Sequence, residues 1–443
     1  MGTVINQSFD ERSLSPQHWM WLGLAAMAWL IEAYDIGIMG AALVPLHHVW
    51  QLTAQETGLL AIASTVGIVL GVIPAGFLID RHGRKRVMIA SLIFYSCVTV
   101  LTGFAGSWQM LALLRGIAGI GLGAMFPIPY TLLSELSPKG RRGMVAGILD
   151  AFLSVGYFVP PLVAAWALPA LGYSAGWRLL FFVAGIGLAF AGVLAKWLPE
   201  SPRWLMTQGR VTEAQKVMGG LNIQNIEQRR QEPVQQIFTS PYLKRTVMLW
   251  ISFPSILFMF YAIMSYMPSI LVREGFSSHS AELFASLIMA ASIPGKFLEA
   301  YLVEHWGRKV VIVGFSVLGG LSALAFPFVH GFSVIVLLGI SLAFFGISVD
   351  PAIKIFTAEQ YPTTLRGKGV AFTEGVGRLI GGALAPYLMA LILADAGPSQ
   401  SFELIAVIAG IGALAVGILG TETQGLPLEE YAARSRPLAV LSS

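Results

Sequence analysis

The chain has 443 residues, of which 56% are hydrophobic and only 12% are charged, with a net charge of +4 and a mean hydropathy of +0.72. Soluble globular domains carry about 25% charged residues, so this composition excludes an ordinary soluble protein. The positive charge would suggest a nucleic-acid partner for a soluble chain, but basic loops account for it in a membrane protein, and we expect no nucleic-acid partner. The single cysteine, Cys97, excludes an intramolecular disulfide and a multi-cysteine metal site.

Apolar segments follow one another along most of the chain, each close to or above the roughly 18 residues that cross a bilayer. We predict an all-α membrane protein with twelve transmembrane helices. In chain order they fall near residues 18–46, 56–79, 87–106, 108–133, 143–168, 177–198, 244–271, 281–303, 309–329, 332–357, 367–393 and 401–420.

Lysine and arginine residues are distributed unevenly among the loops that join these segments. If both termini are cytoplasmic, 22 of the 28 basic residues fall at the two ends or in loops on the cytoplasmic side. Only Arg178 and Arg273 fall in loops on the opposite side. Because basic residues accumulate on the cytoplasmic side of membrane proteins, this distribution predicts that both termini are cytoplasmic.

The chain matches itself when it is shifted by 224 residues without a gap. The shift predicts two parallel six-helix repeats: an N-terminal bundle over residues 1–199, a cytoplasmic linker over 200–243, and a C-terminal bundle with a short tail over 244–443. The superimposed pairs are Asp80 with Glu304, Gly83 with Gly307, Arg84 with Arg308, Lys85 with Lys309, Glu135 with Glu359, Pro138 with Pro362, Arg142 with Arg366, and Gly143 with Gly367.

Acidic and basic residues recur together in these superimposed loops. Orientation in the membrane requires lysine and arginine, but it does not require the repeated acids. We therefore expect ion pairs that hold the two halves together on the cytoplasmic side and open when the halves rock apart, the alternative being a role in topology alone. The expected gating residues are Asp80, Arg84, Glu135, Arg142, Glu304, Arg308, Glu359 and Arg366.

Several motifs resemble those of the major facilitator transporters and together cover nearly the whole chain. "DRHGRKRV" resembles the signature loop between spans 2 and 3 of that superfamily, and "RGIAGIGLGA" resembles its span-4 motif. "SELSPKGRRG", "PESPRWL" and "AEQYPTTLRGKG" are similar to motifs of the sugar-porter branch and its relatives. These stretches begin at residues 80, 115, 134, 199 and 358.

Two later stretches, "SIPGKFLEAYLVEHWGRK" (292–309) and "GRLIGGALAP" (377–386), resemble the organic-ion transporters, the bacterial niacin transporters and the synaptic-vesicle glycoprotein 2 relatives. In organic-anion members, basic residues at the positions of Lys296 and Arg378 help to bind anions. The resemblance therefore implies the major facilitator fold and an anionic substrate. The span-7 glutamine pair of true sugar porters is absent from "FMFYAIMSYMP" (258–268).

Two acids in the first span, Glu32 and Asp35, are three residues apart and so lie on one helix face. Charged side chains within a membrane cost roughly 2.5–3.5 kcal/mol each to insert and usually mark function. Tyr34 and Asp35 resemble the "YD" pair of proton-coupled sugar porters, in which the aspartate pairs with a span-4 arginine, here Arg115. We expect these acids and Arg115 to carry proton coupling. The alternative is a static buried ion pair.

Three basic residues in the second half lie within spans, each close to an acid on the same helix: Lys296 near Glu299, Lys354 near Asp350, and Arg378 near Glu374. Each could be an intrahelical pair that merely allows insertion. A guanidinium also suits bidentate binding of a carboxylate. The expected substrate-binding residues are Arg378, Lys296, Glu374, Tyr34, Tyr130, Tyr157 and Tyr261, the aromatic ones contacting a flat ring unless they serve only packing.

We therefore predict a secondary transporter that takes up a small organic acid, an aromatic or pyridine carboxylate such as nicotinate, by proton symport with alternating access. It would act as a monomer in the cell (inner or plasma) membrane. The alternatives are a proton-coupled or facilitative sugar, polyol or organic-cation transporter and, less favoured, a non-transporting receptor. We expect no enzyme activity, cofactor or metal, because no nucleophile motif, phosphate loop or dinucleotide fingerprint is present.

Overall fold

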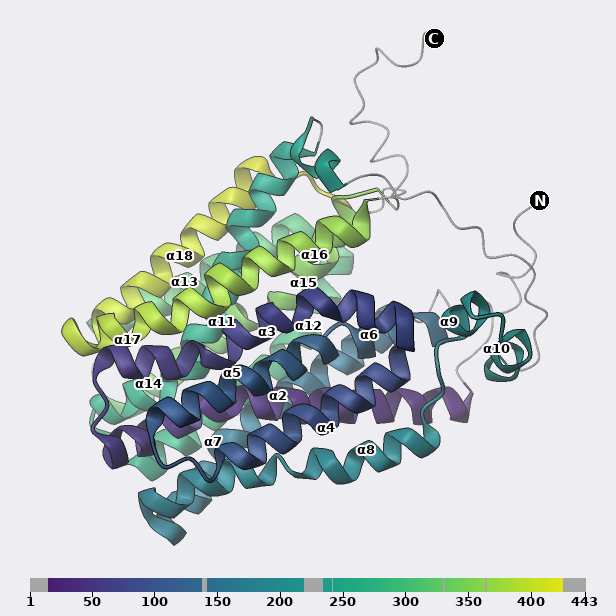
Figure 1. Ribbon diagram of the computed structural model, residues 1–443. Helices are drawn as coiled ribbons and strands as arrows, with labels where there is room; N and C mark the ends of the chain where they lie inside the picture. The colour runs from purple at the N-terminus through teal and green to yellow at the C-terminus, as the bar shows by residue number, and fades with distance from the viewer. Residues whose placement is uncertain are drawn as a thin grey trace. The chain divides into compact units, whose positions relative to one another are not determined.

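The computed structural model describes residues 15–137, 142–218, 234–240, 242–329, 331–362 and 365–424. Helices are the only regular secondary structure in these ranges (Figure 1). The described residues fall into two compact units. Unit 1 comprises Met1–Gln228 with Ser278–Ser286, and unit 2 comprises Arg229–Ser277 with Leu287–Ser443.

Unit 1 contains two capped helices at its start. Ser15 accepts a hydrogen bond from the His18 amide, and Thr53 forms a reciprocal capping box with Glu56; such caps satisfy amides that have no partner within the helix. The helices of this unit are α2 (Pro16–Trp50), α3 (Ala54–His82), α4 (Arg84–Thr102), α5 (Trp108–Met125), α6 (Ile128–Leu136), α7 (Arg142–Val183), α8 (Ile186–Trp197), α9 (Pro202–Thr207) and α10 (Val211–Val217).

Unit 2 contains α-helices interrupted by two π-helical segments, η4 and η5. The first turns of α12 belong to unit 1 and the remainder to unit 2. The helices are η2 (Val234–Phe238), α11 (Leu243–Arg273), α12 (Ser278–Trp306), α13 (Arg308–Ala325), η3 (Phe326–Phe328), α14 (Phe332–Leu342), η4 (Ala343–Ile347), α15 (Asp350–Glu359), α16 (Arg366–Gly377), η5 (Arg378–Leu384), α17 (Ala385–Asp395) and α18 (Pro398–Leu419).

Eleven helices in the described ranges are long and apolar enough to cross a membrane. The predicted spans 143–168 and 177–198 fall in one continuous stretch, Met144–Trp197. Gly172 interrupts that stretch with φ 71° and ψ 170°, a conformation that glycine adopts most easily. The all-α membrane architecture is confirmed, whereas the count of twelve spans stays a prediction.

The first helices of the two predicted repeats, α2 and α11, are largely buried: 89% and 83% of their most apolar windows are buried. In unit 1, α2 packs along α7, and α5 packs along both α3 and α4 (Figure 1). In unit 2, α18 packs along both α11 and α13. The acids of the first span therefore lie in the interior of unit 1, and the aromatic face of α11 lies in the interior of unit 2.

The α3–α5 contact depends on glycine. A Cβ atom on Gly119 would lie 2.3 Å from the Ser64 carbonyl oxygen and 2.9 Å from the Gly67 Cα atom. One on Gly123 would lie 2.2 Å from the Ile68 carbonyl oxygen. Small residues allow helix backbones to approach closely in membranes, and this approach brings α5, which carries Arg115, against α3.

We predict that Gly119→Ala destabilises the protein by about 1–3 kcal/mol, the usual range for overpacking a tight contact. The methyl group would have to separate α3 from α5. Gly192→Ala in α8 is the matched control, because its Cβ atom would meet nothing within 4 Å, and alanine favours the helix. Thermal unfolding in detergent should show a lower midpoint for the Gly119 variant alone; equal midpoints would contradict the packing argument.

Candidate functional site

A buried ion pair joins α2 to α5 in unit 1. Arg115 Nη1 lies 2.7 Å from Asp35 Oδ1, and both side chains are fully buried. Arg115 Nη2 also donates to the backbone carbonyl of Asp35 at 2.9 Å. The sequence prediction that these two residues pair is therefore confirmed as geometry.

Two further side chains fix the guanidinium. Arg115 Nε donates to Ser64 Oγ of α3 at 2.8 Å, and Nη1 donates to Thr99 Oγ1 of α4 at 3.2 Å. Asp35 Oδ2 has no hydrogen-bond partner among the described residues. Ion pairs this deeply buried are stable only when their remaining hydrogen bonds are made. Arg115 meets that condition, while one oxygen of Asp35 stays available for a proton.

Glu32 lies one turn before Asp35 on α2 and is also fully buried. Both carboxyl groups act electrostatically on the buried Tyr95 hydroxyl of α4. The two acids predicted to couple protons therefore share one region of unit 1 with Arg115.

The predicted aromatic residues of unit 1 occupy different environments. The Tyr34 hydroxyl donates to the Leu180 carbonyl at 2.9 Å, so its hydrogen is used within the protein. Tyr157 is buried, whereas Tyr130 is 44% exposed and lies beside Trp29, with ring centroids 6.2 Å apart. All three side chains have rings that a flat substrate could contact, but the Tyr34 hydroxyl hydrogen is already donated within the protein.

A cluster of charged residues occupies unit 2. Lys354 Nζ lies 2.6 Å from Asp350 Oδ2 on α15, as the intrahelical alternative predicted. Lys296 of α12 and Arg378 at the start of η5 are both buried and both act electrostatically on Asp350. Arg378 Nη1 donates to the Tyr261 hydroxyl of α11 at 3.4 Å. We call these five residues the cationic cluster, because three of them are basic and one is acidic.

Two other acids lie next to the cationic cluster in sequence. Glu299, one turn after Lys296, is 1% exposed. Glu374, one turn before Arg378 on α16, is half-buried. The structure therefore brings Arg378, Lys296 and Tyr261 together, and Glu374 lies on the adjoining helical turn.

Both π-helical segments adjoin the cationic cluster. The segment η4 ends three residues before Asp350, and η5 begins at Arg378. A π-helical segment changes the direction of the side chains that follow it and is frequent at functional sites. Close contacts with α11 hold η5 in place: a Cβ atom on Gly381 would lie 2.3 Å from the Pro254 carbonyl oxygen.

The charged loop of unit 1 forms a network around the start of α4. Arg84 pairs with Asp80 at 3.8 Å and with Glu135 at 3.5 Å. Glu200 Oε1 accepts the backbone amides of Arg84 at 2.8 Å and Lys85 at 3.0 Å. Ser201 donates its hydroxyl hydrogen to Glu135. The network thus joins four separate segments of unit 1.

Unit 2 repeats this network around the start of α13. Arg308 pairs with Glu304 and with Glu359, both at 3.3 Å. Glu422 accepts the backbone amides of Arg308 at 3.0 Å and Lys309 at 2.9 Å. The Thr423 hydroxyl donates to Glu359, as the Ser201 hydroxyl does to Glu135.

Sequence reasoning missed the two capping carboxylates, Glu200 and Glu422. They are 222 residues apart, so a gap-free shift of 224 residues does not superimpose them. A shift shorter by two residues, which aligns Glu-Ser with Glu-Thr, would have found them. A Cβ atom on the glycine before each capped helix would clash with a carboxylate oxygen of the capping acid, at 2.4 Å for Gly83 and 2.5 Å for Gly307.

The other two residues of the expected gating set are Arg142 and Arg366, and the structure describes the side chain of one of them. Arg366 is half-buried at the start of α16, and the side chain of Arg142 lies outside the described residues. Each ion pair given above for the gating set joins residues of one unit. A role of this set in holding the two halves together stays a prediction.

The family model for the Major Facilitator Superfamily matches residues 25–347 and 271–442. The chain belongs to this superfamily. The niacin transporter NiaP of Acinetobacter baylyi is 31% identical over 425 residues, which cover 93% of this chain and 96% of that protein. The protein is therefore a multi-pass membrane transporter of the organic-ion and niacin transporter type.

Other relatives agree with this assignment. The putative niacin/nicotinamide transporter NiaP of Bacillus subtilis is 29% identical and matches over 92% of this chain and 97% of its own length. The benzoate transport protein of A. baylyi is 26% identical, over 88% and 86%. The inward-open structure of the xylose transporter XylE from Escherichia coli has a TM-score of 0.77 at 18% identity, covering 95% of this chain and all of that one. This structural likeness shows the shared fold.

We predict that Glu200→Ala loosens the start of α4. The substitution removes the acceptor for two amides that have no partner within the helix, and lost caps cost about 0.5–2 kcal/mol. Hydrogen exchange at the Arg84 and Lys85 amides should accelerate. Glu213→Ala is the control: Glu213 is exposed, and the hydrogen bond from the Arg210 guanidinium that lowers its pKa lies within the linker. Unchanged exchange in the Glu200 variant would contradict the capping role.

Proposed function

We propose that this transporter takes up a small aromatic or pyridine carboxylate, such as nicotinate, by proton symport. The observation that carries the proposal is the cationic cluster in unit 2. It contains three basic side chains, and each of them attracts the Asp350 carboxylate: Lys296, Lys354 and Arg378. Because burying charge is costly, three basic side chains gathered around one carboxylate suit a site that binds an anion.

Arg378 is the residue that we assign to the substrate carboxylate. Its guanidinium offers a planar fork that matches two carboxylate oxygens, and its bond to the Tyr261 hydroxyl is long, at 3.4 Å, so an anion can compete for that donor. Lys296 would add a second positive charge. The names of the relatives, which are transporters of niacin and benzoate, support an aromatic carboxylate over a sugar.

The substrate ring would contact aromatic side chains. Tyr261 lies at the cationic cluster, and Tyr34, Tyr130 and Tyr157 are the candidates from unit 1. Because the Tyr34 hydroxyl is bound to Leu180, we assign Tyr34 a contact through its ring only. Glu374 would tune the charge around Arg378 from the adjoining turn.

Proton coupling is assigned to Asp35, with Arg115 as its partner and Glu32 as a neighbouring acid. Ionised Asp35 attracts Arg115 at 2.7 Å. Protonation would remove that attraction and change the balance between conformations. The availability of Asp35 Oδ2 supports this role over a static ion pair.

For the transport cycle we propose twelve spans with both termini in the cytoplasm, the break at Gly172 dividing the stretch 144–197 into two of them. Residues 1–199 and 244–443 would move relative to each other in alternating access, joined by the linker 200–243. The two charged-loop networks would bias this movement from the cytoplasmic side. The transporter would work as a monomer in the cell (inner or plasma) membrane.

We predict that Arg378→Lys weakens binding of nicotinate or benzoate by about 1.5–3 kcal/mol, the value of a hydrogen bond to a charged group, because lysine keeps the charge but not the fork. Arg378→Ala should weaken it by about 2–5 kcal/mol. Titration calorimetry on purified protein measures both. The control is Arg203→Lys, an exposed arginine of α9.

Parallel titrations with a hexose and a quaternary amine separate the alternatives. Unchanged affinity for the acids in a folded Arg378→Ala protein would exclude the carboxylate site. Binding of the amine in place of the acids would favour an organic-cation transporter, whose substrate Glu32 and Asp35 would attract.

We predict that Asp35→Asn abolishes accumulation driven by a pH gradient in proteoliposomes while substrate counterflow continues. Asparagine fits the same space but cannot exchange a proton, so movement of the substrate is no longer tied to the gradient. Asp395→Asn, an exposed acid at the end of α17, should accumulate substrate normally. Full accumulation by the Asp35 variant would remove Asp35 from the coupling mechanism.

A further inference from the structure

One buried acid has no role in the functions proposed so far. Glu282, in the second turn of α12, is fully buried, and neither carboxyl oxygen has a hydrogen-bond partner among the described residues. It belongs to the segment Ser278–Ser286 that is part of unit 1. An ionised carboxylate in this position would lack both a counter-charge and a donor, which costs far more than keeping its proton.

The surroundings of Glu282 are defined by α7. His279, Glu282 and Ser286 are spaced so that they share one helix face. His279 Nδ1 donates to the Ala165 carbonyl at 2.7 Å, and the Ser286 hydroxyl donates to the Phe158 carbonyl at 3.0 Å. Glu282 therefore faces α7 between these two contacts.

The titratable groups on the neighbouring faces are histidines and tyrosines, which carry no permanent positive charge. His279 is the nearest titratable residue on α12, and Tyr157 and Tyr173 are those on α7. His48 of α2 stacks on Tyr173, with ring centroids 4.5 Å apart and an interplanar angle of 4°. In the described part of the chain, burial alone acts on Glu282, with no contribution from a charged side chain.

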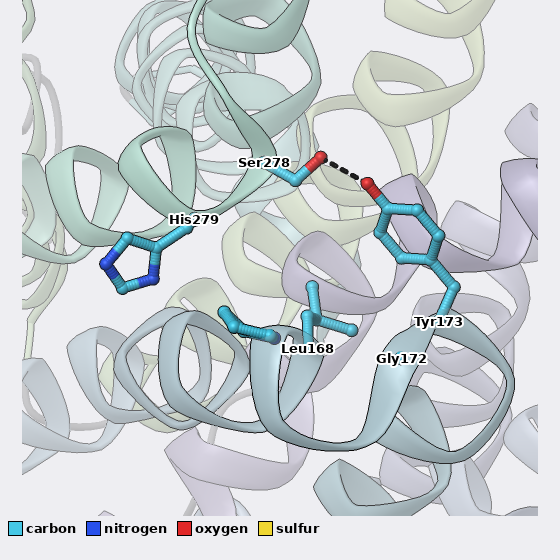
Figure 2. A pocket seen from close by; sticks show the side chains of 6 residues that line it. Leu168, Gly172, Tyr173, Ser278 and His279 are labelled. Carbon is cyan, nitrogen blue, oxygen red and sulfur yellow. Dashed lines mark hydrogen bonds between the residues drawn. The ribbon is translucent and has the colours of Figure 1, made fainter.

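A cavity lies one helical turn before Glu282 on α12. It has a volume of about 230 Å³ and is lined by Leu168, Pro169, Gly172, Tyr173, Ser278 and His279. This volume is large enough for water molecules, and Tyr173, Ser278 and His279 offer polar groups to them. Figure 2 shows His279 and Tyr173 on either side of Leu168, with the Tyr173 and Ser278 hydroxyls 2.7 Å apart.

The state of the His279 ring follows from its contact. Pro169 has no amide hydrogen, so the Ala165 carbonyl four residues earlier lacks its helical donor, and His279 Nδ1–H supplies one. A carbonyl only accepts, so Nδ1 carries the hydrogen and Nε2 of the neutral ring carries the lone pair. The His279 side chain is exposed, and its Nε2 is a hydrogen-bond acceptor.

We propose that Glu282 is a proton-binding site at which the coupled proton enters the transporter. The proposal rests on the proposed proton symport, and the proposed topology places this end of α12 outside. Stability alone does not explain the acid, because glutamine would fill the same space without the cost of keeping a carboxyl group protonated at neutral pH.

The test is transport of radiolabelled nicotinate in proteoliposomes. With one coupled proton, a gradient of one pH unit supports about tenfold accumulation. Glu282→Gln should lower the accumulation ratio to about one and keep counterflow. Glu282→Asp should restore accumulation, because it restores a titrating group. Glu403→Gln, an exposed acid in the second turn of α18, is the matched control and should behave like the unmodified protein.

Normal accumulation by Glu282→Gln would overturn the assignment. Loss of counterflow together with accumulation in folded Glu282→Gln protein would also overturn it, since that result indicates a structural or substrate-binding role. If the unmodified protein accumulates no nicotinate or benzoate, the symport proposal fails instead.

A second measurement on the purified protein decides the role of Glu282 without any substrate. Infrared difference spectra between acidic and alkaline buffer should contain the carbonyl band of a protonated carboxyl group, and this band should be missing in Glu282→Gln. A band of equal intensity in both proteins would overturn the assignment of Glu282 as the titrating group.

Discussion

The arrangement of both units depends on the cost of placing an ionised side chain among apolar helices. Such a group is stable only when an opposite charge or several hydrogen-bond donors surround it. Arg115 meets this requirement with the Asp35 carboxylate and hydrogen-bond acceptors from three neighbouring helices. Asp350 meets it with two lysines and an arginine drawn from several elements. Each charged cluster therefore fixes which helices must be neighbours.

The same requirement explains why glycine-rich contacts and charged clusters occur together. Arg115 reaches Ser64 on α3 because Gly67 and Gly119 allow α3 and α5 to approach closely. The segment η5, which starts with Arg378, approaches α11 at Gly381 in the same way. Close backbone approach shortens the distance that a long side chain must span, so the contacts of the charged side chains depend on the small residues.

Much of this organisation could be predicted from the sequence, because hydrophobic length and residue spacing are local properties. The apolar segments, the Asp35–Arg115 pair and the Asp350–Lys354 pair follow from such patterns or from resemblance to known motifs. The π-helical segments could not be predicted, because no residue pattern distinguishes them from a continuous α-helix. Glu282 was missed because it stands second in the predicted span 281–303, where an acid resembles an ordinary residue at the water boundary.

The capping carboxylates were missed for a different reason, which concerns the history of the repeat. Glu200 and Glu422 hold equivalent positions in space although their sequence offset differs by two residues from that of the charged loops. The two halves have therefore diverged in the length of the chain that leads to the cap, while the cap itself is unchanged. Capping two amides requires the carboxylate to occupy one position in space, but it places no constraint on the length of the chain that precedes it.

Gly83 and Gly307 have a related consequence for how this chain can change. At each glycine a carboxylate oxygen of Glu200 or Glu422 lies too close to leave room for a Cβ atom. A side chain on the glycine would expel the carboxylate, and a shorter side chain at the acid would leave an empty space above two bare amides. Replacing either member of a pair therefore disturbs the other, and a hybrid protein that exchanges one of the two loops must carry both the glycine and the glutamate.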